Sequence, residues 1–221
     1  MVASDSVNEY RLTGVLLILA FISFAIGGTL PVVGEKGNHA IFTLPAHEHL
    51  LAVADNAHIW RWANLFMGSA VVLVLAGLTM LTMLLEGANE RILSRLGLVG
   101  FLLAAVLWVI FSVFRGVITI RAAQEMAATA TASAGVVPPY YEPLAQWCYS
   151  LFYVYAVVGF LALAMYGGSL LQTGLLPGWA GWATLVFSIV LLIQLLIMGD
   201  TLPAFHYFPS LLIGILLLVR G

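Results

Sequence analysis

The charged residues of this 221-residue chain are separated by long stretches that carry no charge. Five of these stretches hold between 19 and 57 residues, and a helix needs about 20 mostly apolar residues to cross a bilayer. Only 8% of the side chains are charged and 62% are hydrophobic, whereas soluble domains carry about 25% charged residues. This pattern excludes a soluble enzyme, a disordered chain and a coiled coil, and it favours an integral membrane protein.

The stretches predict six membrane spans. The longest, 143–199, would make one helix about 85 Å long, so we place a break at Gln172–Gly178. In lipid every backbone polar group must be satisfied within the segment, and alternating barrel-type strands are absent, so the spans are helices. The sequence predicts an all-α fold, a polytopic six-helix transmembrane bundle. It forms a single transmembrane domain over 1–221, with spans at about 12–34, 62–85, 96–118, 147–170, 178–198 and 201–219.

The third and the last predicted helices extend beyond the limits of their charge-free stretches or contain a proline. The third should continue past Arg115 to about Ala128, because the residues there still favour a helix. The last must begin near Asp200–Pro203, because a helix starting at Pro209 would be too short to cross the bilayer. Pro209 would then lie inside that helix and kink it.

Arginine placement gives an orientation. The short 86–95 loop carries Arg91 and Arg95, and cytoplasmic loops are enriched in cations. We therefore expect the N-terminus and the C-terminus to be cytoplasmic. The two long loops, 35–60 and 119–146, then lie on the outer face.

Histidines gather on that outer face. Four of the five lie within residues 39–58, and the fifth, His206, lies in the last outer turn. The segment 45–60 predicts a short interfacial helix on which Asp55 and His58 are close enough to bind one metal ion. A site for a metal ion or a b-type haem is one interpretation, with His58 and His206 as axial haem ligands. The other is ordinary interfacial histidines. The candidate metal ligands are His47, His49, Asp55, His58 and His206, with Asp200 assisting.

Arg115 follows 19 uncharged residues, so its charge would lie in or near the hydrocarbon of the bilayer, where a charge is unfavourable. Such a residue either snorkels to the interface, pairs with an acid or lines a functional pocket. The acids available on the outer face are Asp200, Asp55 and Glu142. Tyr149 and Tyr153, one helical turn apart, could hold a flat apolar ligand, or they could simply pack against a neighbouring helix. The ligand-pocket candidates are Arg115, Asp200, Tyr149 and Tyr153.

Three segments carry a family resemblance: Tyr10–Leu17 at the first span, Arg61–Leu65 at the second, and Gly174–Trp182 between the fourth and fifth. With them the whole chain resembles uncharacterised bacterial six-span membrane proteins that are grouped as a domain of unknown function. The resemblance implies the six-helix layout and a bacterial cytoplasmic membrane. It implies no activity.

Three functions are compatible with these features. The first is a non-catalytic membrane subunit, or a binding module for an apolar ligand or partner helix, in contact with the lipid bilayer and with other membrane subunits. The second is a membrane oxidoreductase or metalloprotein with a histidine-based metal or haem site. The third is a small-solute transporter or channel with Arg115 in its path, which the missing inverted repeat disfavours. A net charge of −2 gives no electrostatic footprint for nucleic acid.

Overall fold

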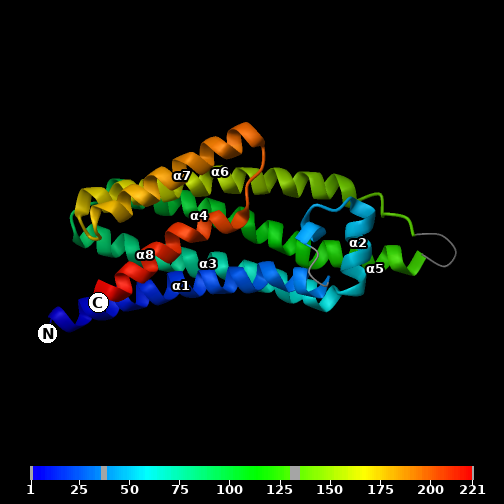
Figure 1. Ribbon diagram of the computed structural model, residues 1–221, viewed down its shortest axis with the longest axis horizontal. Helices are drawn as coiled ribbons and strands as arrows, with labels where there is room; N and C mark the ends of the chain where they lie inside the picture. Colours follow the sequence, from blue (N-terminus) through cyan, green and yellow to red (C-terminus); the bar gives the residue numbers. More distant parts are fainter. Residues whose placement is uncertain (1, 36–38, 130–134, 221) are drawn as a thin grey trace. The chain divides into compact units, whose positions relative to one another are not determined.

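The computed structural model describes residues 2–35, 39–129 and 135–220, and these residues form helices and connecting turns without a strand (Figure 1). The α-helices are α1 (Val2–Gly34), α2 (Ala46–Asp55), α3 (Ala57–Gly87), α4 (Ile92–Val113), α5 (Thr119–Thr129), α6 (Tyr141–Thr173), α7 (Gly178–Met198) and α8 (Tyr207–Arg220). Two short 3-10 turns, η1 (His39–Phe42) and η3 (Pro203–His206), and one π-helical turn, η2 (Phe114–Ile118), complete the described elements.

Six helical segments within the described ranges are long and apolar enough to cross a membrane. They are Asn8–Gly34, Ala57–Gly87, Ile92–Thr129, Tyr141–Thr173, Gly178–Met198 and Pro203–Arg220. This confirms the predicted all-α polytopic membrane fold. The protein is an integral membrane protein whose helices contact the lipid bilayer.

The helix ends differ from the sequence-based ranges. α4 does continue, through η2 and α5, to Thr129, as predicted. α6 begins at Tyr141, six residues before the predicted start, so the segment expected to be a loop at 119–146 is helical at both ends. Pro143 does not prevent the early start, because proline in the first helical turn replaces an N–H that has no intrahelical partner.

The last span begins with the 3-10 turn η3, and its α-helical part, α8, begins only at Tyr207. Pro209 is therefore the third residue of α8 and lies in its first turn, where a missing backbone N–H is tolerated. The sequence predicted a proline kink in this part of the last span, and the structure has a change from 3-10 to α geometry between His206 and Tyr207.

The chain divides into two compact units. Unit 1 comprises 1–22, 70–107 and 153–221, and unit 2 comprises 23–69 and 108–152. The helices α1, α3, α4 and α6 run through both units, and α2, η2 and α5 belong entirely to unit 2. α7 and α8 belong to unit 1.

Close helix packing in unit 1 depends on glycine. A Cβ atom on Gly14 of α1 would lie 2.7 Å from the carbonyl oxygen of Gly214 on α8, and Figure 1 shows these two helices side by side. A Cβ on Gly167 of α6 would lie 2.6 Å from the backbone nitrogen of Leu185 on α7. Small residues of this kind let membrane helices approach closely enough for dispersion forces to hold them.

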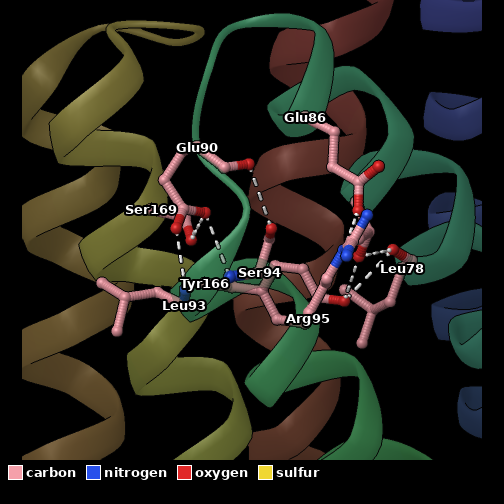
Figure 2. A network of polar contacts seen from close by, with 9 residues as sticks. Leu78, Glu86, Glu90, Leu93, Ser94, Arg95, Tyr166 and Ser169 are labelled. Atoms are coloured by element: carbon pink, nitrogen blue, oxygen red, sulfur yellow. Dashed lines mark hydrogen bonds and ion pairs between the residues drawn. The ribbon is translucent and has the colours of Figure 1, made fainter.

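A polar network in unit 1 fixes the start of α4 (Figure 2). The Glu90 carboxylate accepts hydrogen bonds from the backbone N–H of Leu93 at 2.7 Å, from that of Ser94 at 3.0 Å, and from the Ser169 hydroxyl at 2.5 Å. Burial opposes ionisation of this carboxyl, but the hydrogen bonds from Ser169, Leu93 and Ser94 outweigh it and hold the pKa of Glu90 below its usual value. Glu90 thus caps α4 and ties it to α6.

Unit 2 is organised around tryptophans whose indoles bond to neighbouring helices. Trp108 Nε1 donates to the Met67 carbonyl at 3.0 Å, which joins α4 to α3, and Trp60 is buried as well. The short helix α2 packs along α5 and buries His49, Leu50 and Val53. This packing places η1 and α2 beside the π-helical turn.

Candidate ligand-binding site

Arg115 lies in the π-helical turn η2, surrounded by aromatic rings of unit 2. Its guanidinium carbon is 4.7 Å from the Trp60 ring centroid, 5.2 Å from that of Phe42 and 5.5 Å from that of Phe111. A guanidinium within about 6 Å of an aromatic face is attracted by the ring quadrupole. Three rings from three segments, η1, α3 and α4, therefore hold one cation. We call Arg115, Phe42, Trp60 and Phe111 the Arg115 cage.

The π turn sets the position of this arginine. The Thr119 N–H bonds to the Phe114 carbonyl, five residues back, instead of to the Arg115 carbonyl that a regular α-helix would use. Trp60 Nε1 donates to that Arg115 carbonyl at 2.9 Å. Gly116 permits the close approach, because a Cβ there would lie 3.1 Å from the Cβ of Asn64 on α3. Single π turns of this kind occur frequently at functional sites.

No acid neutralises Arg115 within the part of the chain that the structure describes. The ion pairs found there join Arg95 to Glu86 and Arg121 to Glu125. The expected pairing of Arg115 with Asp55 or Glu142 does not form, and both of these acids are exposed. The residue as a whole has intermediate exposure, and its guanidinium is buried among the rings.

His49 supports the cage from α2. It is 8% exposed, its Nδ1 lies 2.9 Å from the Ile41 carbonyl, and its ring meets the Trp60 ring edge-on at 5.1 Å. Burial and the nearby Arg115 charge lower the pKa of His49 to about 4, although the hydrogen bond to Ile41 acts in the opposite direction. His49 is therefore neutral at pH 7 and donates from Nδ1 to the Ile41 carbonyl, which orients Trp60.

Of the predicted pocket residues, Tyr149 does reach this region. Its ring lies 6.1 Å from the Phe111 ring, which also contacts the Arg115 guanidinium, and 55% of Tyr149 is exposed. Tyr153 and Asp200 belong to unit 1. The Asp200 carboxylate accepts a hydrogen bond at 2.7 Å from the backbone N–H of Thr201.

The single helix predicted over 45–60, which would place Asp55 and His58 on one face, is interrupted, and their joint binding of a metal ion stays a prediction. α2 ends at Asp55, and Asn56 leaves the helical region with a φ of −128°. His58 then lies, exposed, in the first turn of a different helix, α3, so the two residues do not share one helical face. Among the described residues, His47 included, no group of three or more His, Cys, Asp or Glu side chains could hold a metal ion.

His206, the fifth candidate ligand, is enclosed in unit 1. It is 1% exposed, its Nε2 lies 3.2 Å from the Ala156 carbonyl, and its ring stacks on Phe160 at 3.9 Å. A Cβ on Gly159 would come within 2.8 Å of the imidazole. The ring is thus enclosed by protein groups, and metal or haem binding stays a prediction.

No family model, no curated protein and no solved structure matches the chain. The resemblance to the bacterial six-span group therefore stays an expectation.

The cage itself could not be found from the sequence. Trp60 could be placed at the start of a span, but nothing in the pattern connects Phe42 and Phe111 with Arg115, because the three residues meet only through tertiary packing. The one available signal was Arg115 itself, as a charge after a long apolar stretch.

Proposed function

We propose that the protein is a non-catalytic membrane binding module, and that the Arg115 cage binds the acidic headgroup of an amphipathic ligand. The observation that carries this proposal is a guanidinium held by three aromatic rings, with no carboxylate paired to it among the described residues.

The chemistry of the cage favours an anionic group. Aromatic rings position a guanidinium without cancelling its charge, and its planar fork of N–H donors matches a carboxylate or a phosphate. A carboxylate in the same place would instead satisfy the cation and make it structural. The cage therefore supplies the cation of an ion pair, and the ligand would supply the anion.

The surroundings of the cage favour an amphipathic ligand. Trp62, Trp147 and Tyr149 are more than half exposed in the same unit, and exposed aromatic residues of this type mark the membrane–water interface. A lipid headgroup occupies that level, while its chains extend into the hydrocarbon. The Arg115 cation would thus lie at the same level of the membrane as an acidic lipid headgroup.

The test is a titration of the detergent-solubilised protein with dioctanoyl phosphatidylglycerol. Arg115→Gln should weaken binding about tenfold, because a charge-assisted hydrogen bond contributes about 1.5 kcal/mol or more. Arg121→Gln is the matched control, since it removes the same charge from α5, where Arg121 is already paired with Glu125. It should bind as the wild type does. Equal affinity in the wild type and Arg115→Gln would contradict the proposal.

We also propose that both termini face the cytoplasm of a bacterial cytoplasmic membrane. Support comes from Arg91, in the short turn between α3 and α4, and from Arg95, in the first turn of α4. In a background where Cys148 is replaced by Ala, Ala88→Cys should react with a membrane-impermeant maleimide only after the cells are opened. Labelling of intact cells would reverse the orientation.

A further inference from the structure

Two buried polar side chains of unit 2 lie in the contact between α3 and α4. Asn64 on α3 is 5% exposed, and Ser112 on α4 is 7% exposed. Within the described part of the chain, Asn64 Oδ1 and Ser112 Oγ make no hydrogen bond. A buried polar atom without a partner is unfavourable, and nearly all such atoms in native proteins bond to protein groups or to ordered water.

The hydrogen bond that Asn64 does make shows which of its atoms needs a partner. Its Nδ2 donates to the Trp60 carbonyl at 2.8 Å. A carbonyl can only accept, so the amide nitrogen must lie on that side, and the remaining atom, Oδ1, needs a donor. The Ser112 hydroxyl can donate, because it does not bond back to the carbonyl four residues earlier as Ser69 does to Leu65 at 2.8 Å.

Two glycines stand opposite these side chains and leave space beside them. A Cβ atom on Gly116 would lie 3.1 Å from the Cβ of Asn64, whereas a Cβ on Gly68 would meet the Ser112 Cβ at an uncrowded 3.9 Å. Gly68 is one helical turn from Asn64 on α3, and Gly116 is one turn from Ser112. The two polar side chains are therefore offset by about 6 Å along the contact between the helices.

One water molecule matches this offset and this chemistry. Two hydrogen bonds of about 2.8 Å let a water bridge two oxygens up to about 5.5 Å apart. Water supplies the donor that Asn64 Oδ1 needs and an acceptor for the Ser112 hydroxyl, whereas a hydrocarbon chain supplies neither. Water also has access to this level, because Ser112 precedes Arg115 by about 4.5 Å and Trp62 is 58% exposed, as is typical of the membrane–water interface.

We propose that one water molecule binds between α3 and α4, donating a hydrogen bond to Asn64 Oδ1 and accepting one from the Ser112 hydroxyl. It joins α3 to the last turn of α4, directly before the π turn. Asn64 in turn bonds to the Trp60 carbonyl, and the Trp60 indole bonds to the Arg115 carbonyl, so the water belongs to the polar contacts that hold this turn. The site needs no anion at Arg115 and is independent of the proposed function.

Nuclear magnetic resonance of the full-length protein in lipid nanodiscs, with isotope-labelled asparagine, detects this water directly. The side-chain amide protons of buried Asn64 should receive magnetisation from water at a short mixing time, with exposed Asn89 as the positive reference. Gly68→Ala places a methyl group in the space beside Ser112 and should abolish the transfer to Asn64 alone. No transfer to Asn64 in the wild type, or undiminished transfer in Gly68→Ala, would overturn the proposal.

The order of stabilities at Gly68 gives a second test. Serine supplies a hydroxyl where the water lies, so the unfolding equilibrium constant of Gly68→Ser should be about fivefold smaller than that of Gly68→Ala. Helix propensity alone predicts the reverse order. Gly28 of α1 is the matched control, because a Cβ there would meet no atom within 4 Å, and Gly28→Ala should be more stable than Gly28→Ser. The alanine variant being the more stable one at both positions would contradict the water site.

Discussion

Glu90 in unit 1 and Arg115 in unit 2 are both charged groups next to membrane-spanning helices, yet their surroundings are opposite in kind. The Glu90 carboxylate accepts two backbone N–H bonds and a serine hydroxyl, and Glu90 is 5% exposed. The Arg115 guanidinium contacts three ring faces, and no carboxylate pairs with it within the described residues. A carboxylate such as that of Glu90, whose hydrogen bonds are made within the protein, stabilises the fold. A guanidinium such as that of Arg115, which is held by rings and lacks an anionic partner, can still bind an anionic ligand.

The largest effect should come from removing the satisfied charge. Glu90→Ala leaves the N–H groups of Leu93 and Ser94 and the Ser169 hydroxyl without their acceptor, so the free energy of unfolding should fall by about 3 kcal/mol. Reversible unfolding in mixed detergent micelles measures this change. Glu86→Ala is the control, because its ion pair with Arg95 is solvent-accessible and should contribute little. Equal losses in the two variants would show that Glu90 is not the anchor of α4.

The next effect concerns the histidine behind the cage. His49 has a folded pKa of about 4 against 6.5 in the unfolded chain, so the unfolded state binds more protons between these values. Stability from this group is complete above pH 6.5 and is lost as the pH falls towards 4. From pH 7.5 to pH 5 the wild type should therefore lose about 2 kcal/mol more than His49→Gln.

The same unfolding assay at the two pH values tests this difference. His58→Gln, which changes an exposed histidine, should follow the wild-type pH dependence. If His49→Gln shows the same pH dependence as the wild type, His49 is not buried as described.

A smaller effect should follow from Trp60→Phe. The change keeps an aromatic ring near Arg115 but removes the indole donor to the Arg115 carbonyl, and it should cost about 1 kcal/mol of unfolding free energy. Trp62→Phe, at a 58% exposed position, should change the unfolding free energy much less. If both substitutions cost the same, the bond from Trp60 does not hold the π turn.

The membrane fold was predictable because its signal is local. The charge-free stretches identify the spans, and Gly174 to Gly178 marks the break between α6 and α7 without reference to any other part of the chain. Helix ends were less predictable. Tyr141 begins α6 before Pro143, since proline is tolerated in the first turn, and α2 stops at Asp55 although the residues after it also favour a helix.

The candidate sites depend on contacts that the sequence does not display. The π turn at Phe114–Ile118 is a one-residue shift in hydrogen bonding, and the sequence gives no signal for it. Phe42 and Trp60 contact Arg115 from η1 and α3, two segments far from it in the sequence. The number of histidines and the spacing of Asp55 and His58 suggested a metal site, whereas His49 and His206 each bond one ring nitrogen to a carbonyl, that of Ile41 and that of Ala156.

If Arg115 is positioned for an acidic headgroup, the protein should immobilise acidic lipids in preference to zwitterionic ones. Spin-labelled phosphatidylglycerol and phosphatidylcholine are compared in vesicles containing the wild type, Arg115→Gln or Arg121→Gln, with electron paramagnetic resonance reporting the immobilised fraction of each lipid. We expect more immobilised phosphatidylglycerol than phosphatidylcholine in the wild type and in Arg121→Gln, and equal fractions of the two lipids in Arg115→Gln. An undiminished preference for phosphatidylglycerol in Arg115→Gln would contradict this expectation.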